Sequence, residues 1–144
     1  MVERSPIAGL HLVSRVQLHA VRTGIIAAEG VFTFRQLLDA SAKIASCLLD
    51  GANDLQEKRV AFLIPPGFQY VATQWGIWRA GGVAVPLGVS QPQPELEYVI
   101  NDSDAEIVIA HPDFVEILRP LAAARNAKFL ITTETLQAAT TTLP

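Results

Sequence analysis

The chain has 144 residues, of which 50% are hydrophobic and 17% charged, with a formal net charge of −3 and a mean hydropathy of +0.30. Its basic residues form no cluster, which excludes the electrostatic footprint of a nucleic-acid-binding protein. No stretch reaches the roughly 18 apolar residues of a membrane span. A chain this short buries only part of its surface, so we expect an exposed apolar patch that another body covers.

Cysteine content and the N-terminal sequence bear on the compartment. Cys47 is the single cysteine, which excludes an internal disulfide and a cysteine-based metal site. A lone thiol suits a reducing compartment. Glu3, Arg4 and Pro6 interrupt any apolar core of a secretory signal, so no targeting segment is predicted. We therefore expect a cytoplasmic protein.

Residues 10–58 are predicted to form a helix, a hairpin and a second helix. Apolar residues recur at helical spacing over Leu10–Val21. Two short apolar runs flank Glu29-Gly30, a pattern typical of a hairpin. Thr33 and Gln36 have the spacing of a capping box, which predicts the start of a long amphipathic helix.

Residues 59–132 are predicted to form a βαβαβαβ unit. Segments of about 17–19 residues separate the apolar runs, which is long enough for a helical crossover and too long for a hairpin. The fold class is therefore predicted to be α/β, with a parallel sheet of strand–helix repeats preceded by the helix and short hairpin. Residues 133–144 are expected to be a fraying tail. The expected strands are Val60–Ile64, Val83–Val85, Glu106–Ala110 and Lys128–Ile131, and the expected helices are Gly67–Ala80, Pro94–Asp102 and Pro112–Ala124.

The turns after the strands carry no phosphate-binding pattern. Ligands of open parallel sheets bind beyond the carboxyl ends of the strands. Pro65-Pro66-Gly67 follows the first strand, and its two prolines remove two amides that a pyrophosphate turn would need. His111-Pro112-Asp113 follows the third strand and contains no glycine. Neither turn predicts a nucleotide site.

The other chemistry-bearing residues favour structural roles. Glycines at a helix end indicate a helix stop, tryptophans at helical spacing indicate core, and the histidines lack metal-ligand spacing. An alternating acidic run lacks the glycine that a calcium loop requires. The sequence therefore predicts no catalytic, cofactor-binding or metal-ligating residue in this chain. The residues in question are Gly81-Gly82, Trp75 and Trp78, His11, His19 and His111, and Asp102 to Glu106.

Several motifs occur together between Arg59 and Ile109. They include Arg79-Ala80-Gly81-Gly82, Val85-Pro86-Leu87 and Leu96-Glu97-Tyr98-Val99-Ile100-Asn101-Asp102-Ser103. Their order and spacing closely resemble the N-terminal lobe of AMP-forming acyl-CoA synthetases, in the adenylate-forming superfamily. The resemblance extends over about residues 10–132. Within the superfamily, the malonyl-CoA synthetase branch is the most similar.

The resemblance implies that residues 1–144 form part of the N-terminal lobe of an acid–CoA ligase. Such a ligase converts ATP, a carboxylate and CoA into acyl-CoA, AMP and pyrophosphate. The acid would be malonate, methylmalonate or a fatty acid, and the full-length enzyme would use ATP, Mg²⁺ and CoA. The family's Ser/Thr/Gly-rich phosphate loop, Gly-x-Thr-Glu motif, ribose-binding Asp and C-terminal-lobe lysine do not occur in this sequence. We therefore carry over no catalytic residue and expect a scaffold and cleft wall that is inactive alone.

Two other functions are also compatible with the sequence. One is a stand-alone α/β interaction module that pairs with itself or a partner through a sheet edge or an apolar face. The other is a free-standing nucleotide-binding domain, which the missing phosphate loop disfavours. The expected partner is thus the remainder of the synthetase or a second copy, and not a nucleic acid.

Overall fold

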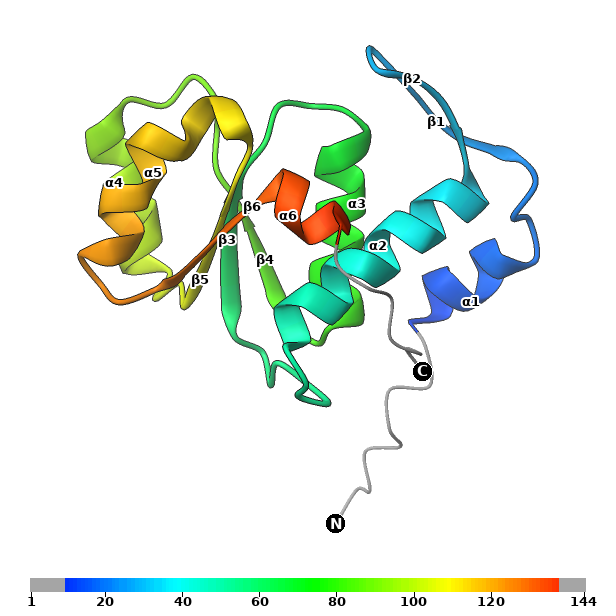
Figure 1. Cartoon of the computed structure of the whole chain (residues 1–144), viewed down its shortest axis with the longest axis horizontal. Coiled ribbons are helices and arrows are strands. Elements are labelled where there is room, and N and C mark those ends of the chain that lie inside the picture. The colour runs from blue at the N-terminus through cyan, green and yellow to red at the C-terminus, as the bar shows by residue number, and fades with distance from the viewer. Residues whose placement is uncertain (1–9, 138–144) are drawn as a thin grey trace.

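The computed structural model describes residues 10–137, and its centre is a four-stranded parallel sheet (Figure 1). The strands are β3 (Arg59–Leu63), β4 (Val83–Pro86), β5 (Ile107–Ala110) and β6 (Lys128–Ile131), in the spatial order β4-β3-β5-β6. The central strands β3 and β5 are buried on both faces, as expected for continuous apolar runs in a parallel sheet. The predicted α/β fold class is confirmed.

The N-terminal elements are α1 (His11–Gln17), the antiparallel hairpin of β1 (Thr23–Ala27) and β2 (Gly30–Thr33), and α2 (Phe34–Leu49). The predicted capping box is confirmed at the start of α2. The Gln36 amide donates to Thr33 Oγ1 over 3.2 Å, and the Thr33 amide donates to Gln36 Oε1 over 2.8 Å. These two hydrogen bonds satisfy amides that have no partner inside the helix.

The first helix is shorter than the sequence predicts. The apolar pattern favours a helix over residues 10–21, but α1 ends at Gln17. Beyond it the backbone turns toward the start of α2, where the Arg35 amide donates to the Ala20 carbonyl over 2.9 Å. Tertiary hydrogen bonding thus replaces the last turn of the expected helix.

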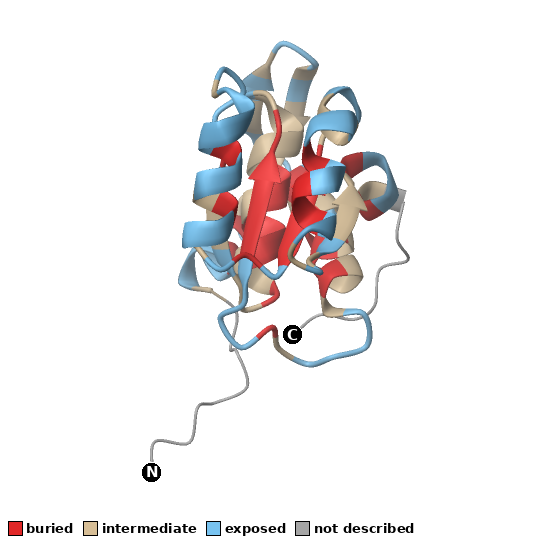
Figure 2. Ribbon diagram, turned by 90° about the vertical axis from the view of Figure 1, so that its left-hand side faces the viewer, coloured by how far each residue is buried: buried red, intermediate tan, exposed pale blue. Residues whose placement is uncertain are grey.

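Helices cover both faces of the sheet. The crossover helices are α3 (Phe68–Arg79), α4 (Gln93–Asp102) and α5 (Val115–Ala123), and a short 3₁₀ turn (Pro112–Phe114) precedes α5. Figure 2 shows the buried strands between helices whose outer surfaces are exposed. Side chains alternate along β3, so each face has its own core. Val60, Phe62 and Ile64 pack with α1, α2 and α3, whereas Ala61 and Leu63 pack with α4 and α5.

The stop at the end of α3 is confirmed at Gly81, which has φ of +83°. This left-handed conformation suits glycine, and a Cβ there would run into the Asp54 side chain. The loop before β3 is tied to the same helix end, because the Leu55 and Glu57 amides donate to the Ala80 and Gly81 carbonyls, each over 2.9 Å. The glycine therefore has a structural role here.

The expected fraying of residues 133–144 is wrong for residues 133–137. They form a short helix, α6 (Thr132–Gln137), that lies against α2 (Figure 1). Thr132 and Thr135 are fully buried, and Leu136 packs against the core. Spacing of three and four residues places these side chains on one face, so burial orders a segment whose composition favours fraying. The rest of the predicted tail lies outside the described residues.

Candidate functional site

The strand order reverses at the carboxyl edge of the sheet, the position where open α/β sheets typically form a crevice. The chain passes from β3 to β4 on one side and then to β5 on the other side of β3. Ligands of open α/β sheets bind at such a reversal point. Here the reversal lies between Pro65–Gly67, after β3, and His111–Asp113, after β5. This edge of the sheet is where the topology predicts a ligand site.

The amino end of α3 faces this crevice and is already capped by a carboxylate from the hairpin. Glu29 Oε2 accepts a hydrogen bond from the Phe68 amide over 2.7 Å. A side chain at Gly67 would run into the same carboxylate. The rings of Phe32 and Phe68 stack beside it with their centroids 4.0 Å apart. A helix amino end ordinarily attracts an anion, and the protein's own Glu29 takes that position.

On the other side of the crevice, His111 has a local structural role. Its Nδ1 accepts a hydrogen bond from the Asp113 amide over 3.2 Å, which starts the 3₁₀ turn. This bond requires a lone pair on Nδ1. The structure does not bring His11 or His19 to it, since both belong to α1 and the segment that follows. Throughout residues 10–137, no three His, Cys, Asp or Glu side chains form a metal-ligand set.

The two tryptophans pack into the apolar core that α2 and α3 share with β3, and Ser41 lies where α2 meets α3. Trp75 is buried and Trp78 packs partly buried against the same core. Arg79 Nη1 donates to the Leu38 carbonyl over 2.8 Å and to Ser41 Oγ over 2.9 Å. Burial lowers the pKa of the Arg79 guanidinium, with Asp39 acting in the opposite direction. The side chain that hydrogen-bonds to the Ser41 hydroxyl is thus an arginine, which is a donor and not a base that could activate the serine as a nucleophile.

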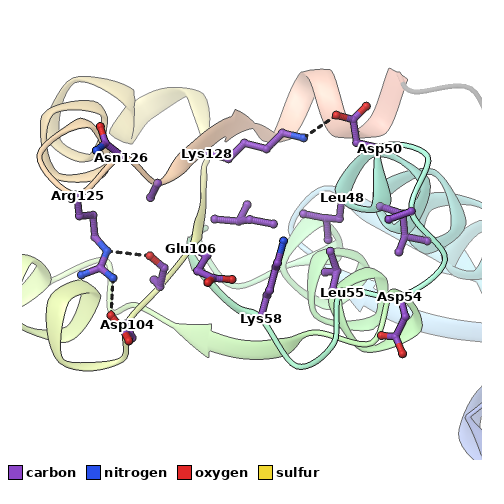
Figure 3. Close-up of a pocket in the computed structure, with 15 residues that line it drawn as sticks. Leu48, Asp50, Asp54, Leu55, Lys58, Asp104, Glu106, Arg125, Asn126 and Lys128 are labelled. Atoms are coloured by element: carbon purple, nitrogen blue, oxygen red, sulfur yellow. Dashed lines mark hydrogen bonds and ion pairs between the residues drawn. The ribbon is translucent and has the colours of Figure 1, made fainter. Parts of the chain in front are cut away.

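A groove of about 620 Å³ opens at the opposite, amino edge of the sheet (Figure 3). Arg125 organises one wall, donating to Asp104 and to the Ala105 carbonyl, each over 2.8 Å. Lys128 forms an ion pair with Asp50 over 3.4 Å on the other wall. The sequence does not predict this groove, because its residues come from distant segments. The charged residues along it are Asp50, Asp54, Lys58, Asp104, Glu106, Arg125 and Lys128.

The charges along the groove largely compensate one another. Three cationic side chains stand against four carboxylates, and two of the cations are already paired. Such an arrangement gives no strong field for either an anion or a cation. Its position at the amino ends of β5 and β6 is also not where open parallel sheets bind their ligands. We assign this groove a structural role.

Several exposed apolar side chains lie on the N-terminal hairpin and in the segment that leads into it. Ile26 and Val31 face each other across the two strands, with 80% and 63% of their surface exposed. Leu18 and Val21, in the segment leading into β1, are 80% and 86% exposed. We refer to these four side chains as the N-terminal apolar surface. Within residues 10–137, no helix combines the length and apolar character needed to cross a membrane.

Comparison with known proteins identifies the family. Residues 14–142 match the family described as AMP-binding enzyme. The mitochondrial malonate–CoA ligase of Mus musculus is 43% identical over 105 residues, which are 70% of this chain and 18% of that protein. The malonate–CoA ligase of Arabidopsis thaliana is 38% identical over 80 residues, covering 56% of this chain and 13% of that protein.

A solved structure shows the same fold. MatB from Rhodopseudomonas palustris superposes with a TM-score of 0.78 at 22% identity, over 91% of this chain and 28% of MatB. The chain thus spans about a fifth of the length of the curated relatives it matches. The predicted resemblance to the malonyl-CoA synthetase branch is confirmed by these relatives. The chain belongs to the AMP-binding enzyme family and corresponds to the N-terminal part of its members.

Proposed function

We propose that this chain is the N-terminal scaffold of an AMP-forming acid–CoA ligase. The whole enzyme would convert ATP, a carboxylic acid and CoA into acyl-CoA, AMP and pyrophosphate. The observation that carries this proposal is the family match over residues 14–142. The 43% identity to a malonate–CoA ligase supports malonate, or the similar methylmalonate, as the acid.

Among the described residues, the amino end of α3 does not fit a phosphate and no side-chain set fits a divalent metal. The amide at the start of α3, which could receive a phosphate, already binds the Glu29 carboxylate over 2.7 Å. A phosphate brought to that position would meet a like charge. The described residues also gather no set of carboxylates or histidines for a metal. We therefore derive no chemical step through this chain, and its contribution is to support a site that the rest of the enzyme would build.

An alternative function is a stand-alone module that self-associates. The observation in its favour is the N-terminal apolar surface, whose four side chains are each at least 63% exposed. Exposed apolar side chains of this kind mark interaction sites more often than scattered single ones do. A concentration-dependent dimer of the isolated chain in sedimentation experiments would support this function. A monomer at every concentration would contradict it.

We also propose a cellular compartment for the protein. The single Cys47 supports a reducing compartment such as the cytoplasm. The mouse relative is described as mitochondrial, so a mitochondrial location is the competing outcome. Fractionation of cells that express the tagged protein distinguishes the two compartments.

The test of the ligase proposal is a chimeric enzyme. The matching segment of the mouse malonate–CoA ligase is replaced by this chain, and AMP formation is measured with malonate and CoA. We expect the chimera to form malonyl-CoA and AMP, and to use malonate better than acetate. The mouse enzyme without the segment serves as the control and should be inactive. A chimera that folds, by circular dichroism, but forms no AMP with any acid would contradict the proposal.

A further inference from the structure

We draw no further inference here: the strongest candidate, the groove at the amino edge of the sheet between Arg125 and the ion pair of Lys128 with Asp50, carries nothing because most of its charged side chains are exposed, and because neither Gln69 nor Thr132, the described residues with a buried side-chain oxygen that has no hydrogen-bond partner, lines it.

Discussion

Gly76 and Arg79 show how single residues hold the largest helix pair together. Gly76 lies on α3 where it meets α2, and a Cβ there would come within 2.6 Å of Ile44 Cγ2 and 3.1 Å of the Ser41 carbonyl oxygen. Three residues later, Arg79 ties α3 to the backbone of α2 at Leu38. The close approach of α2 and α3 requires a small residue at Gly76. Arg79 then supplies hydrogen bonds to polar groups at the interface between the two helices.

Gly76→Ala should therefore destabilise the chain although alanine favours helices. The added methyl meets the fully buried Ile44 and a backbone oxygen, and overpacking of this kind costs about 1–3 kcal/mol. Urea unfolding measures the change in the free energy of unfolding. Ile44→Ala in the Gly76→Ala background should cost less than Ile44→Ala alone, because it makes room for the methyl. Additive effects of the two substitutions would contradict this packing account.

Cys47 should react slowly with alkylating agents at neutral pH. Burial raises the pKa of its thiol, Asp50 and Glu134 raise it further, and only Lys128 lowers it. The thiolate is the reactive form, so the inflection of the rate of iodoacetamide modification against pH should lie above that of the urea-unfolded chain. Lys128→Met removes the lowering charge and should move the inflection higher still. An inflection below that of the unfolded chain would show that burial does not dominate the pKa of the Cys47 thiol.

At the scale of elements, the hairpin and α3 depend on each other. The first residue before α3, Gly67, provides no side-chain cap, and Glu29 supplies the acceptor from 39 residues away. The stacked rings of Phe32 and Phe68 reinforce the contact. A local sequence pattern starts α2 through Thr33 and Gln36, whereas a distant side chain completes the start of α3.

Glu29→Ala should loosen the hairpin and the first turn of α3 together. Loss of the cap is expected to cost about 0.5–1 kcal/mol, toward the low end for capping residues because Glu29 is exposed. Hydrogen exchange should show faster exchange of the Phe68 amide and of the β1–β2 ladder. Glu97→Ala, an exposed carboxylate on α4, is the matched control and should leave these amides protected. Unchanged exchange at Phe68 would mean that Glu29 does not hold the two elements together.

At the scale of the whole molecule, helices cover both faces of the sheet. The described residues form no reactive centre. Both faces of β3 and β5 are covered, the carboxyl-edge crevice is capped by Glu29 and bordered by the turn at His111, and the amino-edge groove carries paired charges. Large apolar side chains stay exposed at the N-terminal hairpin and the segment before it, and also at Val83, Val89, Tyr98 and Ile117. The arrangement is that of a packed scaffold.

The chain alone should therefore neither bind ATP nor turn it over. Addition of ATP with Mg²⁺ should leave its thermal unfolding midpoint unchanged, since a ligand that binds only the folded state would raise it. Pyrophosphate release with malonate and CoA should stay at background. The active chimera proposed above is the positive control for both measurements. A rise in the midpoint, or release of pyrophosphate by the chain alone, would contradict the scaffold role.

Sequence by itself determined the local and periodic features of this protein. The alternation of apolar runs and amphipathic segments specified the parallel α/β class, the capping box located the start of α2, and Gly81 marked the end of α3. Each of these features depends on residues close together in the chain, where spacing alone fixes the geometry. Ordered family motifs likewise identified the family.

The tertiary structure decided the features that depend on contacts between distant residues. It ended α1 at Gln17 by hydrogen bonding the next segment to α2, and it ordered Thr132 and Thr135 into α6 by burying them. It also placed Glu29 on α3 and left Ile26 and Val31 uncovered. A periodic pattern shows which side of an element is apolar, but only the packed fold shows whether anything covers that side.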